Sequence, residues 1–227
     1  MNDYQKYGLL RILAGNGEFK IGVCWMLTTN DNRTDGKLTS YLNVPQYWRL
    51  YDPPLFDILQ QRVIAEKNRN VDVAQVDQII PNAEFYSEIL SDSMMNRNKY
   101  FEQAVPKFKS CNLIFYDPDN GVEIKSVAKG KRNSAKYIYW DEVCQTFGNG
   151  HSLLVYQHFP HVERKTFIEE RMREYKVRLN AVEVYCFQTT RVAYFLAIQE
   201  KHKELINSKL ELVLTKWNSQ IQIYKQI

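Results

Sequence analysis

Short apolar runs that alternate with longer amphipathic segments are the feature that most constrains how this chain can fold. The runs LIFY at 113–116 and LLVY at 153–156 contain only aliphatic and aromatic side chains. Such runs are typical of strands that are covered on both faces of a sheet. Because segments with helical spacing separate them, the pattern predicts an α/β protein whose central strands are parallel.

Periodicity and the residues that end helices and strands predict the individual elements. Helices are expected at 3–14, 45–68 with a break at Pro53 and Pro54, 94–108, 161–179 and after Glu200, with a shorter helical segment at 140–147. Strands are expected at 19–27, 76–80, 83–90, 112–117, 136–140, 152–159, 181–188, 192–199 and 221–224. Only the tripeptide TTR joins the strands at 181–188 and 192–199, which favours an antiparallel hairpin.

A chain of 227 residues is long enough to bury one large core and too short for two generous domains. The order of elements therefore predicts a single domain over residues 1–227. Its architecture is expected to be one doubly wound, mostly parallel α/β sheet that closes with an antiparallel C-terminal hairpin.

Composition and charge bear on the partners and the cellular location of the protein. The net charge of +4 permits a nucleic-acid partner without requiring one. The four cysteines lie far apart with no C-x-x-C pair, which favours reduced thiols. The opening MNDYQKYGLL lacks the apolar core of a signal peptide, and no apolar run approaches the roughly 20 residues that span a bilayer. We therefore expect a cytoplasmic protein with no membrane partner.

The stretch FYDPDNGVEIK at 115–125 follows the cleanest predicted strand and has three readings. Pro-Asp-Asn-Gly is a strong turn sequence that needs no function. Alternatively, Asp117, Asp119 and Glu123 can supply oxygen ligands to Mg²⁺, with Lys125 assisting the attacking water of a nuclease or phosphodiesterase. In the third reading, Asp117 and Asn120 form the substrate-gripping loop of a methyltransferase.

Two further polar segments are candidates for substrate binding. The segment YQHFPH places Tyr156, Gln157 and His158 at the end of another predicted strand. Ligands of such sheets bind outside the carboxyl ends of the strands. The tract KGKRNSAK, which ends at Lys136, is basic and is expected to be an exposed loop that can meet phosphates. P-loop, G-x-S-x-G, H-E-x-x-H and G-x-G-x-x-G motifs are all absent from the sequence.

The order of elements and two short motifs resemble the class I Rossmann-like methyltransferases that use S-adenosylmethionine. FYDPDNG looks like a variant of the Asp-Pro-Pro-Tyr loop of the amino-methyltransferases, with Asp117 and Pro118 matching its first two positions. DYQKYGLL is similar to the opening helix of the small ribosomal-RNA adenine-N6 methyltransferases, with Asp3, Lys6 and Tyr7 in the matching places. The glycine-rich cofactor loop of that class is missing, because the first strand runs into TTNDNRTDGK.

The resemblance implies a nucleic-acid-modifying enzyme, most concretely an adenine-N6-type methyltransferase-like protein with S-adenosylmethionine as cofactor and RNA or DNA as partner. Asp117 would orient the target amine, and Asn120 and Gln157 would bond the base or cofactor. Lys6 and Lys136 would meet phosphate, and the remaining expected substrate contacts are Tyr7, Tyr156 and His158. Two alternatives stay open: the Mg²⁺-dependent nuclease, and a non-catalytic binding protein on a methyltransferase-like scaffold.

Overall fold

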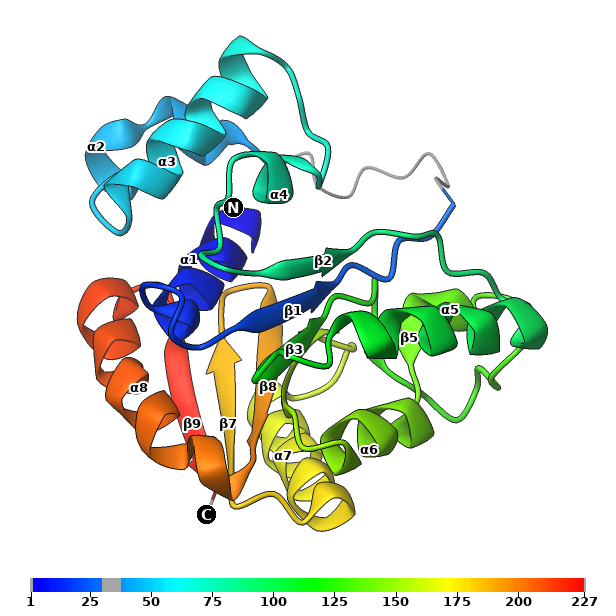
Figure 1. Cartoon of the computed structure of the whole chain (residues 1–227). Coiled ribbons are helices and arrows are strands. Elements are labelled where there is room, and N and C mark those ends of the chain that lie inside the picture. Colours follow the sequence, from blue (N-terminus) through cyan, green and yellow to red (C-terminus); the bar gives the residue numbers. More distant parts are fainter. Residues whose placement is uncertain (1, 30–37, 227) are drawn as a thin grey trace.

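A computed structural model describes residues 2–29 and 38–226 of the chain (Figure 1). Within these residues seven strands form one sheet, in the order β2 (Glu84–Tyr86), β1 (Ile21–Cys24), β3 (Leu113–Tyr116), β6 (Ser152–His158), β8 (Val192–Ile198), β7 (Glu183–Gln188) and β9 (Gln222–Gln226). The first four are parallel, whereas β8 is antiparallel to both β6 and β7, and β9 is antiparallel to β7. The predicted α/β class with its mostly parallel sheet and closing hairpin is confirmed.

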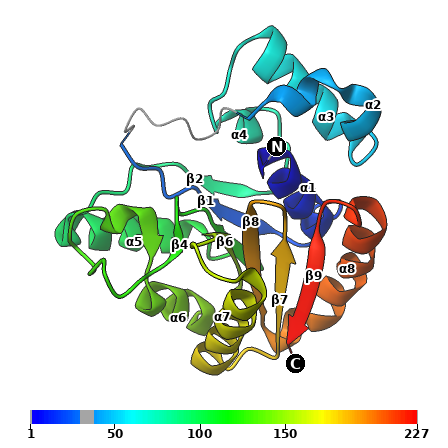
Figure 2. The same ribbon diagram turned by 180° about the vertical axis from the view of Figure 1, so that it is seen from behind.

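Helices cover both faces of this sheet, as Figures 1 and 2 show. One face packs against α1 (Asn2–Ala14) and α8 (Lys203–Trp217), which share a core cluster with the inward side chains of the strands. The other face packs against α5 (Met94–Lys107), α6 (Trp140–Gly148) and α7 (Arg164–Leu179). A two-stranded parallel pair, β4 (Gly121–Val122) with β5 (Tyr137–Ile138), lies beside the main sheet.

The connection between β1 and β2 contains a helical segment, residues 38–80, which lies above α1 in Figure 1. Its helices are a 3-10 turn (Ser40–Asn43), α2 (Pro45–Trp48), α3 (Pro53–Leu59), a π-helical turn (Gln60–Ala65) and α4 (Val73–Val76). Arg11 of α1 fixes this segment, because its guanidinium donates to the Asp52 carboxylate at 2.7 Å and to the Ile79 carbonyl at 2.7 Å. The Tyr4 hydroxyl adds a bond to the carbonyl of Trp48 at 2.9 Å.

The expected strand at 76–80 is wrong. The chain there ends α4 at Val76 and turns, with Gln78 at φ 47°. Ile79 and Ile80 are buried directly from this turn, so their apolar character reflects core contact and not strand pairing. Short apolar runs of this kind do not distinguish a strand from a buried turn. Across the described residues, the helices are too short or too polar to cross a bilayer.

Candidate active site

The carboxyl ends of β1, β3 and β6 meet at one edge of the sheet, because these strands are adjacent and parallel. Asp117 directly follows β3, and its N–H donates to the carbonyl of Cys24, the last residue of β1, at 3.1 Å. Gln157 and His158 are the last two residues of β6. The predicted strand-end residues therefore lie at the edge where sheets of this kind bind ligands.

Helix α1 brings Lys6 to this edge, where it forms a buried ion pair with Asp117. The Nζ of Lys6 donates to Oδ2 of Asp117 at 2.8 Å and lies 3.1 Å from Oδ1 of Asp3. The side chains of Lys6 and Asp117 are only 10% and 16% exposed, against 51% for Asp3. The two motifs that carry the methyltransferase resemblance thus meet in space although they lie 111 residues apart in the chain.

Burial and charge act in opposite directions on this pair. Burial disfavours the Lys6 cation, but the carboxylates of Asp117 and Asp3 outweigh it and hold the pKa of Lys6 well above its usual value. Burial also raises the pKa of Asp117, and the attraction of Lys6 opposes that rise without cancelling it. Lys6 is therefore a fixed cation, and Asp117 is a carboxyl group whose ionisation depends on it.

Aromatic side chains enclose the pair. The Nζ of Lys6 lies 5.1 Å from the ring centroid of Trp25 and 5.5 Å from that of Tyr7, within cation–π range. Tyr194 of β8 is fully buried, and the charges of Lys6 and Asp117 both act on its hydroxyl. Within the described residues, neither the indole N–H of Trp25 nor the Tyr194 hydroxyl has a hydrogen-bond partner. Buried polar groups are seldom left in this state, so the site keeps unused hydrogen-bonding capacity.

Gln157 holds the DPDNG loop in place through backbone contacts. Its amide nitrogen donates to the carbonyls of Asn120 at 2.9 Å and His158 at 3.0 Å, and its oxygen accepts the N–H of Val122 at 3.0 Å. Gly121 lies against this amide with φ 116°, and a Cβ there would overlap it. Since the Gln157 amide is bonded at both ends, these contacts give it a positioning role in the loop.

Beyond Asp117, the nuclease alternative uses Asp119, Glu123 and Lys125, which lie in different surroundings. Asp119 is exposed and accepts the Thr28 hydroxyl at 3.0 Å. Oε1 of Glu123 accepts the N–H of Trp140, the first residue of α6, at 2.8 Å. Lys125 is exposed on the loop. In the described part of the chain, no three His, Cys, Asp or Glu side chains gather closely enough to hold a metal ion.

The remaining predicted residues lie around the same edge with different degrees of burial. Tyr7 is buried beside Trp25, with ring centroids 6.1 Å apart. Tyr156 is half-buried, and its ring packs edge-on against Tyr194 at 5.8 Å. His158 is exposed, whereas Lys136 is half-buried and its carbonyl accepts the N–H of Asn120 at 2.9 Å.

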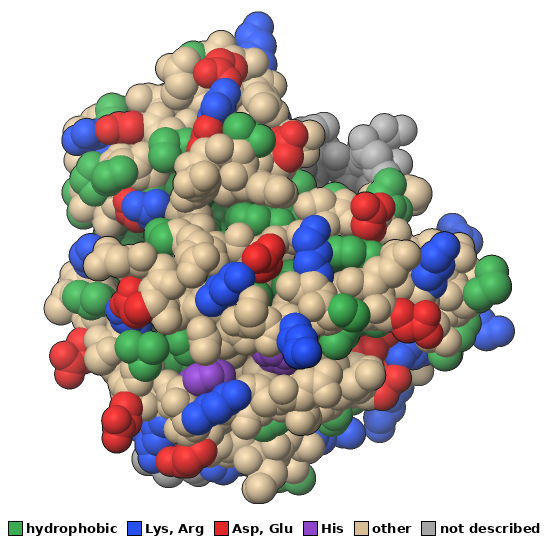
Figure 3. All heavy atoms as spheres, viewed as in Figure 1, with side chains coloured by type: hydrophobic (Ala, Val, Ile, Leu, Met, Phe, Trp, Pro, Cys, Tyr) green, Lys and Arg blue, Asp and Glu red, His purple; other side chains and the backbone are tan. Residues whose placement is uncertain are grey.

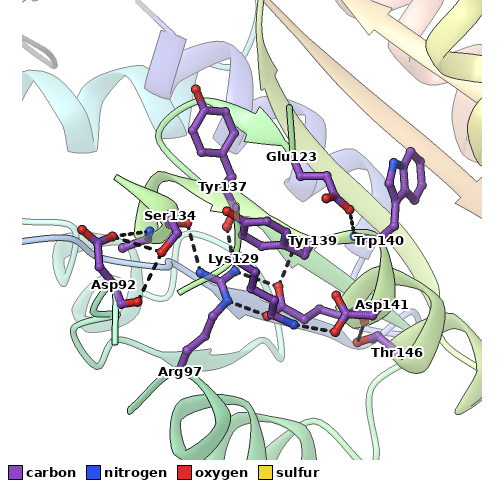
Figure 4. A network of polar contacts seen from close by, with 12 residues as sticks. Asp92, Arg97, Glu123, Lys129, Ser134, Tyr137, Tyr139, Trp140, Asp141 and Thr146 are labelled. Atoms are coloured by element: carbon purple, nitrogen blue, oxygen red, sulfur yellow. Dashed lines mark hydrogen bonds and ion pairs between the residues drawn. The ribbon is translucent and has the colours of Figure 1, made fainter. Parts of the chain in front are cut away.

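A second buried ion pair, which the sequence did not reveal, lies on the other face of the sheet (Figure 4). Arg97 of α5 is fully buried and donates to both carboxylate oxygens of Glu142 at 2.6 and 2.7 Å. Its guanidinium also donates to the carbonyls of Ser134 at 3.1 Å and Tyr137 at 2.7 Å. The tract expected to be a solvated basic loop is thereby fastened to the protein. Lys129 within it lies 2.9 Å from Glu142 and is not an exposed phosphate ligand.

Comparisons with known proteins give one distant structural likeness and no family. No family model matches the sequence, and no curated protein matches it. Among solved structures, it is similar to a Legionella pneumophila protein of the family DUF519. The TM-score is 0.43 at 11% identity, covering 98% of this chain and 95% of that one. A likeness this distant leaves the functional argument to the chain's own residues.

Proposed function

We propose that this chain is a nucleic-acid-modifying enzyme that transfers a methyl group to the exocyclic amine of a base, as adenine-N6 methyltransferases do. The ion pair between Lys6 and Asp117 carries the proposal. The segments DYQKY and DPDNG each resemble that family on separate grounds, and the 2.8 Å contact joins them at the carboxyl edge of the sheet.

The residues of the site suit this chemistry. A carboxylate at Asp117 accepts an N–H of the exocyclic amine and so raises the electron density on its nitrogen. That nitrogen would take up the methyl group, and the amine would release one proton to water. Lys6 supplies the positive charge that favours the carboxylate form of Asp117. The rings of Tyr7 and Trp25 exclude water and thereby strengthen these contacts.

The residues near the ends of β1 and β2 fit a nucleoside cofactor. Glu88 follows β2 and is exposed, next to Ile89, which bridges to Leu27 beyond β1. A carboxylate at this place can accept bonds from ribose hydroxyls. Met26 adopts φ 49°, a left-handed turn two residues after β1, where the methyltransferases that the chain resembles have a glycine-rich loop. S-adenosylmethionine, when bound, supplies the methyl group as a sulfonium electrophile. The loop around Gly36 lies outside the described residues.

The test is binding of S-adenosylmethionine by calorimetry in the presence of EDTA, followed by transfer of labelled methyl to RNA and to DNA. Asp117→Asn keeps the shape of the side chain and removes its charge. We expect a loss of transfer of about 10²–10³-fold, the size that follows removal of one aimed electrostatic group. Asp57→Asn on α3, which changes an exposed aspartate in the same way, is the matched control.

The other outcomes identify the alternatives. In a second outcome, the protein binds Mg²⁺ and not S-adenosylmethionine. If Asp119→Ala together with Glu123→Ala abolishes that Mg²⁺ binding, the nuclease replaces this proposal. Failure to bind either ligand would leave the non-catalytic scaffold as the function to pursue.

A further inference from the structure

A cavity of about 220 Å³ opens at the same edge of the molecule, between the helical segment and the turn that joins β7 to β8. Its lining is aromatic and aliphatic with one hydroxyl and one guanidinium, from Leu38, Ser40, Tyr41, Val44, Trp48 and Arg191. We call it the base pocket. None of these residues belongs to the site around Asp117.

The base pocket adjoins that site through α1. Tyr41 stacks on Tyr4 with ring centroids 5.7 Å apart and an interplanar angle of 18°. Tyr4 lies two residues before Lys6 on the same helix. Tyr41 thereby joins the wall of the base pocket to the helix that carries Lys6. The base pocket and the site around Asp117 therefore both have a wall that contacts the first turns of α1.

The guanidinium of Arg191 supplies a positive charge at the rim. Arg191 is exposed, and no ion pair or side-chain hydrogen bond joins its guanidinium to the described part of the chain. Its backbone is nevertheless fixed, because the Thr189 hydroxyl accepts the N–H groups of Arg191 at 3.3 Å and Val192 at 3.1 Å. The turn thus presents an arginine fork, the group best suited to bind a phosphate.

The walls suit a flat aromatic ligand. The rings of Tyr41 and Trp48 meet edge to face, with centroids 5.9 Å apart, and Trp48 is only half-buried. The volume is below the range of about 300–1,000 Å³ that encloses a whole small-molecule ligand. A single ring system fits such a space, with the rest of the ligand outside. Aromatic walls next to an arginine are the combination that binds unpaired bases and their phosphates.

We infer that the base pocket binds one unpaired base of a single-stranded nucleic acid, beside the base at Asp117, with the adjoining phosphate on Arg191. The inference rests on the proposed function and names its substrate class, because a base stacked inside a duplex cannot enter this cavity.

The test is a fluorescence-anisotropy titration of the full chain with a labelled single-stranded RNA oligonucleotide, with the same sequence as a duplex for comparison. Arg191→Ala should weaken binding by roughly tenfold or more, since the charged fork is lost. Ser40→Glu places an acid in the mouth of the cavity and should weaken binding at least as much. Both positions are exposed, so both variants should fold. Arg173→Ala, which removes an exposed arginine from α7 on the opposite face, should bind as the wild type does.

Wild-type affinity in both Arg191→Ala and Ser40→Glu would overturn the base pocket, as would equal affinity for duplex and single strand. The proposed function is scored separately. If the oligonucleotide binds through Arg191 but no methyl transfer is found, the base pocket is supported and the proposed reaction is contradicted. If wild type and Arg191→Ala transfer methyl with equal efficiency, the proposed reaction is supported and the base pocket is contradicted.

Discussion

Two buried ion pairs, Arg97 with Glu142 and Lys6 with Asp117, lie on opposite faces of one sheet. They differ in how many of their polar atoms have hydrogen-bond partners. The guanidinium of Arg97 uses all three of its nitrogens, and the Glu142 carboxylate also accepts the N–H of Tyr139 and lies 2.9 Å from Lys129. Lys6 contacts Asp117 at 2.8 Å and Asp3 at 3.1 Å, and two buried donors beside it, the Trp25 indole N–H and the Tyr194 hydroxyl, have no partner in the described chain.

The difference separates a structural element from a candidate site. A buried charge is tolerated when hydrogen bonds satisfy it on all sides, and then it fixes the arrangement of the elements around it. Arg97 fixes the loop between β4 and β5 against α5 and α6 in this way (Figure 4). Around Lys6, the indole N–H of Trp25 and the hydroxyl of Tyr194 are left without a partner in the described chain. On the face seen in Figure 3, basic and acidic side chains are interspersed, so surface charge there does not mark a site.

The largest effect is expected from Arg97→Met. The variant leaves Glu142 buried with Lys129 as its remaining cation, and loss of one partner of a buried pair costs about 3–5 kcal/mol. Urea denaturation should show this loss in the midpoint, and adding Glu142→Leu should restore part of it. Arg49→Met, at an exposed pair with Asp57, is the control and should leave the midpoint almost unchanged. If Arg97→Met is as stable as the wild type, the structural role assigned to this pair is wrong.

Lys6→Met should cost less stability than Arg97→Met and more activity. Because the pKa of Lys6 is raised in the folded protein, the pair contributes stability below the usual lysine pKa of 10.5 that is lost as pH rises through the folded pKa. We expect a loss of about 1–3 kcal/mol at neutral pH, since Asp117 can take up a proton when its partner is removed.

The pH profile distinguishes Lys6→Met from a simple packing defect. Without the cation, burial raises the pKa of Asp117 further. The acid limb of kcat/KM for methyl transfer should therefore move to higher pH. An unmoved acid limb, with activity reduced equally at every pH, would mean that Lys6 does not act through Asp117.

Two tyrosine hydroxyls give a smaller and closely matched comparison. The hydroxyls of Tyr116 and Thr146 form a hydrogen bond at 2.8 Å, whereas the Tyr194 hydroxyl has no partner in the described chain. Tyr116→Phe should cost about 1–2 kcal/mol in thermal unfolding, because it breaks a buried bond. Tyr194→Phe should be neutral or stabilising, because the hydroxyl that it removes has no partner in the described chain. Equal destabilisation by the two variants would show that the Tyr194 hydroxyl is satisfied inside the protein.

The sequence predicts the site residues that their immediate neighbours in the chain identify. It does not predict those that only the order of strands in the sheet brings to the site. Asp117 was found because a polar residue directly after an apolar strand is a local signal, and Lys6 because it lies in a recognisable motif. Tyr194 was missed because β8 inserts beside β6 ahead of β7, which brings it to the site from a position that reads as ordinary core. Arg97 was missed because an arginine among polar neighbours in a helix has the pattern of a solvated face.

The smallest effects test the nuclease alternative, because its two distal residues make unlike contacts. Glu123 accepts the N–H of Trp140 at the start of α6, so Glu123→Ala should lose a helix-capping bond worth about 0.5–2 kcal/mol. Lys125 is exposed, and Lys125→Ala should leave both the thermal midpoint and methyl transfer unchanged. In a metal-dependent nuclease both variants should instead lose cleavage of RNA or DNA in Mg²⁺, since Glu123 would hold the metal and Lys125 would assist the attacking water. Measuring cleavage beside thermal unfolding for both variants therefore decides whether the DPDNG loop ends in a helix cap or in a catalytic lysine.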